Sequence, residues 1–214
     1  MNTADERLLE GLRTALQGEL PGHDAFLHLS GYKRPDLEAA QRLNPAPRES
    51  AVLALVYPRA GSLHTLLMLR PQYDGVHSGQ VAFPGGRRED QDRDLRDTAL
   101  REFSEETGAP AADFDVLGTL SRVYIPPSRS LVTPFVAWAP ALPPTTPDPR
   151  EVAALIETPL DELMRPDVVQ VRRQYIQVLG REAEIPYFDL QGHVVWGAIA
   201  MMLAELRELL HRLR

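Results

Sequence analysis

Hydrophobic positions in the first half of the chain recur with a helical period and then with a strand period. Four leucines at helical spacing predict an amphipathic helix over residues 5–17. Sparse apolar residues and recurrent prolines indicate an irregular arm over residues 21–47, with at most a short helix at 36–42. The apolar runs 51–57 and 65–69 follow, and the turn residues between them predict two neighbouring strands.

The middle of the chain contains a second helical pattern between further strand-like runs. Residues 94–107 have helical periodicity, and Gly108 stands where a glycine commonly ends a helix. The apolar runs 114–125 and 131–138 predict more strands. Residues 140–149 hold five prolines and no periodicity, so they are expected to form a loop.

The end of the chain predicts a strand and a closing helix. The strand is expected at 184–190, at the edge of a sheet because Pro186 has no N–H to donate, and the amphipathic helix at 194–213. Together the segments predict an α+β fold in which a mixed β-sheet lies between helices. We expect an N-terminal helix and arm over residues 1–47 and a domain over residues 48–214 that includes the closing helix.

Composition narrows the range of functions. With 214 residues and 43% hydrophobic residues the chain is long enough for one domain with a sizeable core. Its net charge of −7 disfavours binding to nucleic acid or to an anionic membrane surface, and no apolar stretch is long enough to span a membrane. No cysteine is present, which excludes thiolate catalysis and cysteine-bound metals, and the acidic start of the chain does not resemble a secretory signal, so we expect a cytoplasmic protein.

Three glutamates dominate the predicted helix at 94–107. Glu102, Glu105 and Glu106 are spaced so that they share one helix face, where like charges repel. A hard divalent cation such as Mg²⁺ would neutralise them, because it prefers oxygen ligands and is held by carboxylates together with substrate phosphates. The alternative is a solvated acidic face paired with arginines such as Arg101. The preceding Gly85-Gly86 turn favours the first interpretation, because glycine permits close approach of the backbone to a ligand.

This part of the chain resembles the signature of the Nudix hydrolases, G-x5-E-x7-R-E-U-x-E-E-x-G-U, in which U is apolar. The matching residues are Gly86, Arg101, Glu102, Phe103, Glu105, Glu106, Gly108 and Ala109. The chain departs from it at Asp92, where the signature has glutamate, and in a spacing from Gly86 to Arg101 that is one residue longer. The longer spacing is similar to that of the coenzyme A pyrophosphatase branch.

The same branch has an upstream motif, L-L-T-x-R-S-x3-R-x-H-x-G-x3-F-P-G-G, which this chain also resembles. The residues that fit are Leu66, Leu67, Arg70, His77, Gly79, Phe83, Pro84, Gly85 and Gly86. Its threonine, serine and second arginine are replaced by Met68, Pro71 and Gly75. The two resemblances together cover about residues 48–190, and they imply metal-dependent hydrolysis of the diphosphate bond of coenzyme A or its derivatives.

The resemblance implies roles for the acidic residues. Glu102 and Glu106 would be the principal ligands of Mg²⁺ or Mn²⁺, with Glu105 a further ligand or the residue that orients water. Arg101 would brace the glutamates through an ion pair. The general base would be Glu105 or Glu151, although Glu151 also suits the first turn of a helix over residues 152–156.

Substrate binding is expected around the glycine turn. Arg70 and either Arg87 or Arg88 would contact phosphates, Gly85 and Gly86 would allow close approach, and His77 would contact substrate or cap local backbone. The partner is thus a small molecule. Two alternatives stay open: a Nudix hydrolase of ADP-ribose, an NADH-type dinucleotide or an oxidised nucleotide, and a non-catalytic module that senses a nucleotide. The leucine-rich closing helix is expected to pack within the chain or in a homodimer.

Overall fold

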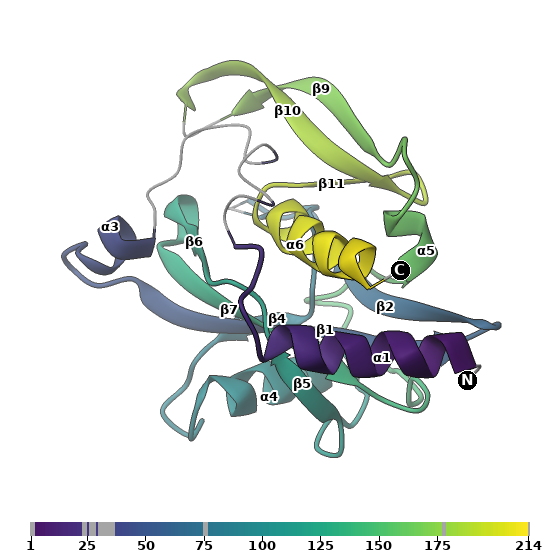
Figure 1. Cartoon of the computed structure of the whole chain (residues 1–214). Coiled ribbons are helices and arrows are strands. Elements are labelled where there is room, and N and C mark those ends of the chain that lie inside the picture. Colours follow the sequence, from purple (N-terminus) through teal and green to yellow (C-terminus); the bar gives the residue numbers. More distant parts are fainter. Residues whose placement is uncertain are drawn as a thin grey trace.

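Figure 1 shows the chain as a computed structural model, which describes residues 3–22, 25, 29, 37–74, 77–176 and 179–213. Its helices are α1 (Thr3–Leu16), α3 (Leu37–Gln41), α4 (Leu95–Thr107), α5 (Leu160–Leu163) and α6 (Ala198–Arg212). Its strands are β1 (Arg48–Arg59), β2 (Ser62–Leu69), β3 (Val81–Ala82), β4 (Gly85–Arg87), β5 (Asp115–Thr119), β6 (Val123–Ile125), β7 (Ser130–Trp138), β8 (Ala154–Pro159), β9 (Val169–Ile176), β10 (Arg181–Leu190) and β11 (His193–Trp196).

Eight of the strands in the described residues form one large mixed sheet. Its main strand order is β3-β2-β1-β7-β5, and β4, β6 and β8 pair with β1, β7 and β2 respectively. Strands β1 and β7 run parallel over nine residue pairs, from Arg48 opposite Ser130 to Val56 opposite Trp138, whereas the other pairs are antiparallel. Because β4 pairs with β1 through Gly85, Gly86 and Arg87, the predicted glycine turn is a short strand in this sheet.

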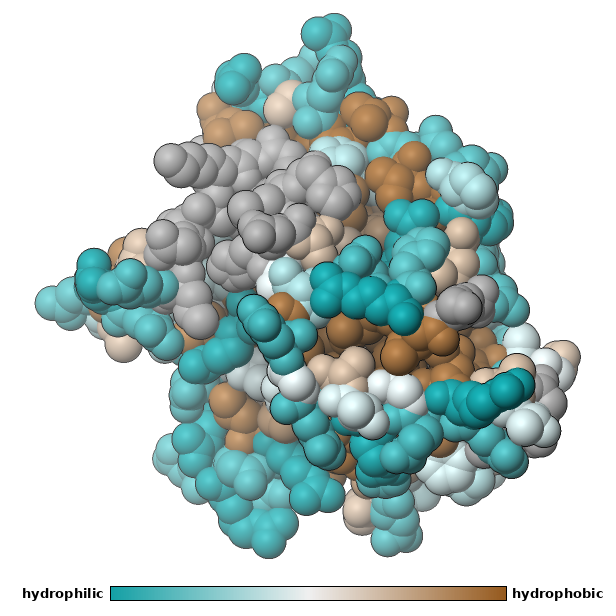
Figure 2. Space-filling model, in the orientation of Figure 1, coloured by the Kyte–Doolittle hydropathy of each residue, from teal (hydrophilic) through white to brown (hydrophobic). Residues whose placement is uncertain are grey.

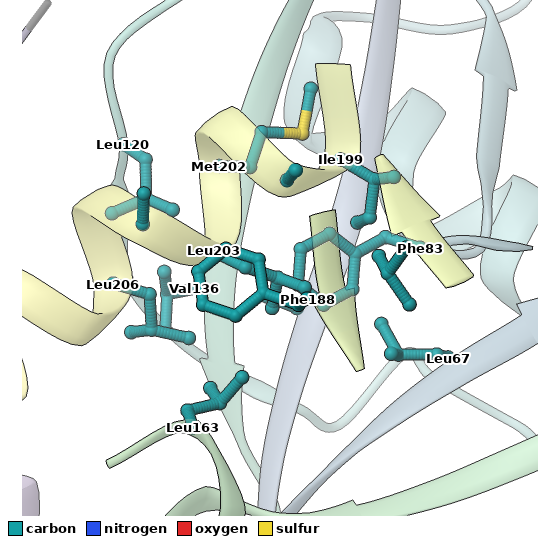
Figure 3. Close-up of a cluster of buried hydrophobic side chains, with 14 of the residues drawn as sticks. Leu67, Phe83, Leu120, Val136, Leu163, Phe188, Ile199, Met202, Leu203 and Leu206 are labelled. Carbon is teal, nitrogen blue, oxygen red and sulfur yellow. The ribbon is translucent and has the colours of Figure 1, made fainter. Parts of the chain in front are cut away.

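Helices cover both faces of the large sheet, as the alternation along β1 requires (Figure 1). Leu53 and Leu55 pack with Phe103 of α4 in one buried cluster. Ala54 and Val56 point the other way, into a cluster that contains the apolar side chains of α1 and α6. Figure 3 shows the centre of that second cluster, with the side chains of α6 among those of the sheet. The predicted α+β fold with a mixed sheet between helices is therefore confirmed.

A second sheet has the strand order β11-β10-β9 and lies above the large sheet together with α6 (Figure 1). The expectation that the strand containing Pro186 is an edge strand was wrong, because β10 is the central strand. Pro186 is nevertheless tolerated, because β11 pairs with β10 only from Tyr187 onward. At Pro186, strand β10 is paired with β9 alone, so the missing N–H removes no bond to β11.

Several predicted elements are confirmed and others were merged or missed. The helices at 5–17, 36–42 and 94–107 are present as α1, α3 and α4. The run 114–125 is two strands, β5 and β6, and the segment 194–213 contains most of β11 before α6. Strands β8 and β9 were not predicted. Among the described residues, no helix is both long and apolar enough to cross a membrane. On the face in Figure 2, hydrophilic residues dominate the outline and hydrophobic ones are visible between α1 and α6.

Candidate active site

Helix α4 carries the acidic residues, and its ends follow from local sequence. The carboxylate of Asp94 accepts a hydrogen bond from the backbone N–H of Asp97 at 2.9 Å and caps the first turn. Gly108 adopts a φ of 71° and donates its N–H to the carbonyl of Ser104, which ends the helix as predicted. Ala99 and Phe103 are fully buried against the sheet, so the rotation of α4 about its axis is fixed.

Glu106 is the most deeply buried of the three glutamates, with a side chain only 2% exposed. One of its oxygens accepts a hydrogen bond from the backbone N–H of Gly85 at 2.7 Å, and the other lies 3.5 Å from the guanidinium of Arg70. Burial is the main reason that the pKa of Glu106 is raised, to about 8. The guanidinium of Arg70 and the N–H of Gly85 oppose this rise, and the nearby charges of Glu102 and Glu151 contribute to it. Glu106 is buried because the helix face that carries it lies against β4.

Glu102 lies one turn before Glu106 and faces the second glycine of β4. A Cβ atom at Gly86 would lie 2.4 Å from the carboxyl carbon of Glu102, so only glycine leaves room for this carboxylate. Burial is the main reason that the pKa of Glu102 is raised, and the guanidinium of Arg101, 3.1 Å away, opposes that rise. Two neighbouring carboxylates are thus desolvated on the same face of the helix.

Arg101 links the helix to the segment between β4 and α4. Its Nε and Nη2 atoms donate to both oxygens of Asp92, at 2.8 and 3.0 Å, and Nη2 also donates to the carbonyl of Arg87 at 3.0 Å. Its Nη1 atom pairs with Glu102 at 3.1 Å and with Glu105 at 2.8 Å. The hydrogen bonds from Arg101 hold the pKa of Asp92 well below its usual range. Arg101 therefore pairs with Glu102 and Glu105 through a guanidinium group that Asp92 holds in place.

Glu105 and Glu151 are the more exposed carboxylates of the site. The side chain of Glu105 is 57% exposed and is paired with Arg101. The loop before Glu151 is attached to the end of α4, because Thr146 and Asp148 donate their backbone N–H groups to the carbonyls of Thr107 and Glu106. Glu151 consequently lies close enough to raise the pKa of both Glu102 and Glu106.

The alternative interpretation of Glu151, as the first-turn charge of a helix over residues 152–156, was wrong. The chain forms strand β8 from Ala154 onward. The bond from Val152 N–H to the carbonyl of Asp148 closes only a single turn before that strand. Glu151 therefore belongs to a loop that is held against the acidic end of α4.

A cavity of about 870 Å³ borders the glycine strand, a size typical of small-molecule sites. Five of the residues that match the upstream motif line it: Arg70, His77, Phe83, Gly85 and Gly86. Arg87 also lines it, whereas the exposed Arg88 pairs with Glu49 and donates to backbone carbonyls. The structure thus favours Arg87 over Arg88 at this site. His77 has a φ of 70°, and its Nδ1 lies 3.1 Å from the side-chain oxygen of Gln80.

Sequence reasoning missed part of the cavity and part of the acidic network. The described lining includes five residues that follow β10: Trp196, Gly197, Ala198, Ile199 and Met202. The clamp of Asp92 on Arg101 was also missed, because the two are nine residues apart and meet only through the turn into α4. The signature position that Asp92 occupies was the available signal for the clamp.

The donor set suits a hard divalent cation. Glu102 and Glu106 are both desolvated and carry raised pKa values, and a nearby cation would favour their charged forms. In the described ranges no three His, Asp or Glu side chains are gathered tightly enough to hold a metal ion, since Glu105 is drawn to Arg101 and Glu106 to Gly85. The residues fit such an ion by their chemistry, and Glu102 and Glu106 are the two whose oxygens lie next to the glycine strand.

Comparisons with known proteins agree with this geometry. The profile of the NUDIX domain matches residues 47–179. The uncharacterized Nudix hydrolase NudL of Photorhabdus laumondii is 33% identical over 169 residues, which is 78% of this chain and 88% of that protein. NudL of Yersinia pestis is 36% identical over 146 residues, 67% of this chain and 70% of that protein. A Nudix hydrolase from M. smegmatis, RenU, shares the fold with a TM-score of 0.54 at 22% identity, over 78% of this chain and 88% of that one.

Proposed function

The chain belongs to the Nudix hydrolase family, whose members act on nucleoside diphosphate derivatives, and from this premise we propose that it hydrolyses the diphosphate bond of coenzyme A. The products are 3′-phosphoadenosine 5′-phosphate and 4′-phosphopantetheine. The observation that carries the proposal is that the motif residues Arg70, His77, Phe83, Gly85 and Gly86 line a single cavity. Two of them, Gly85 and Gly86, also lie against Glu106 and Glu102 of α4.

We propose that Glu102 and Glu106 hold a divalent cation, Mg²⁺ or Mn²⁺, with Glu105 as an additional ligand. When bound, this ion neutralises phosphate charge and acidifies a bound water. The structural support is that both glutamates are desolvated and contact the strand whose glycines border the cavity. Arg101 is a positioning residue, because it contacts Glu102, Glu105 and the backbone of Arg87 rather than the cavity.

In the reaction, the oxygen of a water molecule forms a bond to one phosphorus while the bridging P–O bond breaks. A carboxylate accepts the proton of the water, and the departing phosphate takes up the negative charge. Arg70 and Arg87 line the cavity and stabilise the phosphates, which suits the charge stabilisation on which phosphoryl transfer depends. Glu105 and Glu151 are the two candidates for the base, and a comparison of Glu105→Gln with Glu151→Gln in their kcat–pH profiles separates them, since the base variant loses the acidic limb.

The test of substrate is product analysis by mass spectrometry after incubation with Mg²⁺ and, in parallel, coenzyme A, ADP-ribose and NADH, with Glu106→Gln as the control. Release of 4′-phosphopantetheine from coenzyme A, with the other two intact and the variant inactive, is the expected result. Turnover of ADP-ribose or NADH instead would retain the site and replace the substrate. Absence of any turnover would favour the non-catalytic sensing module.

A further inference from the structure

The cavity next to the glycine strand is bounded by two different layers of the molecule. One wall belongs to the large sheet and includes Arg70, Gly85 and Gly86. The other comes from β9, β11 and the start of α6, which lie above that sheet (Figure 1). Most of this second wall, including Trp196, Ile199 and Met202, lies beyond the residues that match the family profile. The cavity is therefore completed by a segment that lies outside the residues matched by the family profile.

The two walls differ in chemistry. The charged residues among the described lining residues are Arg70 and Arg87, both on the sheet side, and none of the described lining residues is acidic. On the opposite side Ile199 and Met202 are buried members of the main hydrophobic cluster, and Figure 3 shows both on α6. The cavity is consequently matched to a ligand with an anionic group at one end and an apolar chain at the other.

A nucleoside fits the apolar wall poorly. A ribose and a base carry hydroxyl and amide groups that lose free energy when they are buried without hydrogen bonds, and the side chains of Ile199 and Met202 offer none. An arm made largely of CH₂ and methyl groups gains from the same contact.

We infer that Trp196, Ile199 and Met202 form a subsite for the non-nucleotide arm of the substrate and select diphosphates that carry such an arm. The inference rests on the proposed function for the orientation of the substrate, with its diphosphate at Gly85 and Gly86. The nucleoside then lies outside this apolar wall, so the wall recognises the part of the substrate that distinguishes coenzyme A from ADP-ribose.

Trp196 provides a direct readout, because the chain has two tryptophans and the other, Trp138, stands at the end of β7 and does not line the cavity. Tryptophan emission is measured in metal-free buffer, where no turnover occurs, during titration with n-butyl, n-hexyl and n-octyl phosphate. Wild-type protein and the Trp138→Phe variant are expected to show a blue shift on binding. Trp196→Phe is expected to show none. The Kd is expected to fall about fourfold for each CH₂ group that is buried.

A filling variant supplies an independent arm of the experiment. Ala198→Leu places extra carbons in the cavity and is expected to weaken binding of octyl phosphate at least tenfold. Ala183→Leu is the matched control, because Ala183 has similar exposure on β10 and is not among the lining residues. Circular dichroism of both variants verifies that they are folded, and the wild-type titration stands if Ala198→Leu is not.

The outcomes separate this inference from the proposed function. Equal affinity for the three alkyl phosphates, or a Trp196 shift caused by adenosine 3′,5′-bisphosphate and not by octyl phosphate, would overturn the apolar subsite. If the alkyl series behaves as expected while the Mg²⁺-loaded enzyme leaves coenzyme A intact, the subsite is supported and the proposed substrate is wrong.

Discussion

The two helices that cover opposite faces of the large sheet each bury one glutamate. Glu205 on α6 is fully buried, and its oxygens accept three short hydrogen bonds: from the N–H of Gly22 at 2.8 Å, and from the N–H and hydroxyl of Ser121 at 2.8 and 2.7 Å. Glu106 on α4 is almost as buried but has one close donor, the N–H of Gly85 at 2.7 Å, and a more distant arginine at 3.5 Å. The two carboxylates are thus similarly buried, but Glu205 accepts more hydrogen bonds than Glu106.

The difference separates a structural carboxylate from one that is available for chemistry. A carboxylate has about four acceptor positions, and those of Glu205 are largely occupied by groups that tie the segment after α1 and the β5–β6 connection to α6. The acceptor positions of Glu106 are incompletely occupied, and the desolvated charge raises its pKa to about 8. A buried carboxylate that the protein itself leaves under-coordinated is expected to be stabilised by a ligand.

The largest effect is expected from exchanging each of these two carboxylates for an amide. Glu106→Gln removes a proposed metal ligand, so turnover of any substrate should fall by more than the roughly 10–100-fold that loss of an outer-shell partner causes. Glu205→Gln should leave turnover near the wild-type value but lower the free energy of unfolding by about 1–3 kcal/mol, because the amide NH₂ faces a backbone donor. Steady-state kinetics and urea unfolding measure the two effects. The opposite pattern would break the comparison.

The two glycines of β4 allow the distinction between structural groups and groups available for chemistry to be tested through the backbone. The three atoms nearest to a Cβ at Gly86 all belong to the carboxylate of Glu102, which can move. Gly86→Ala should therefore preserve stability and reduce kcat by about 10–100-fold through displacement of that carboxylate. A Cβ at Gly85 would lie 2.4 Å from the carbonyl oxygen of Ala51, at a φ of 152°. Gly85→Ala should therefore cost about 1–3 kcal/mol of stability or more.

Thermal unfolding together with kcat separates the two glycine variants. If Gly86→Ala unfolds as easily as Gly85→Ala, then Glu102 is held rigidly and the glycine is needed for folding rather than for the position of the carboxylate. Equal, near-wild-type activity in Gly86→Ala would show that Glu102 does not act from the position it has beside β4.

Asp92 extends the comparison to a third carboxylate, whose oxygens, like those of Glu205, accept several hydrogen bonds from the protein. It accepts from Arg101, from the hydroxyl of Thr98 at 2.9 Å and from the N–H of Glu89 at 2.9 Å. Asp92→Asn breaks a buried pair and should lower the free energy of unfolding at pH 7 by about 3 kcal/mol. The pKa of Asp92 is lowered in the folded state, so its stabilisation is present above the unfolded pKa and is lost as pH falls through the folded pKa.

The pH series provides the control for this prediction. The difference in unfolding free energy between wild type and Asp92→Asn should be constant above about pH 5 and shrink as the pH falls below about 4, where the unfolded-state aspartate takes up its proton. A difference that does not change with pH would mean that the pair with Arg101 contributes through packing and not through charge.

Sequence patterns predicted what is local and failed where distant segments meet. The start, end and buried stripe of α4 were predictable because Asp94, Gly108 and Phe103 act within the helix or on the sheet directly beside it. The burial of Glu106 was not, since helical periodicity gives the face of a residue but not what covers it. Here the cover is Gly85, 21 positions earlier.

The apolar wall of the cavity was missed for a related reason. The apolar residues of β11 and α6 were assigned to one long helix because they are nearly continuous in sequence. Gly197 interrupts them with a φ of 75°, which turns the chain from strand to helix and brings Trp196 and Ile199 to the same cavity. Strand β9 was missed because four of its eight residues are arginine or glutamine, and it lies at the edge of the smaller sheet. For β11 and α6, the available signal was Gly197, a glycine inside an otherwise helical pattern.

The smallest of these effects is expected from the neighbouring arginines 87 and 88. They differ as the two glutamates do, because the guanidinium of one has hydrogen-bond partners in the protein and that of the other is open to a ligand. Arg88 pairs with Glu49 at 3.3 Å and donates to two backbone carbonyls, so Arg88→Ala should change stability by no more than about 1 kcal/mol and leave KM unchanged. Arg87 is exposed at the cavity, and within the described residues its guanidinium makes no hydrogen bond or ion pair. Arg87→Ala should therefore raise KM for a diphosphate substrate about tenfold, the loss of one charge-assisted hydrogen bond of roughly 1.4 kcal/mol, and the rise should shrink at high salt because the contact is exposed. Equal KM values for the two variants would place the phosphates away from Arg87 and leave Arg70 as the cation of the cavity that contacts them.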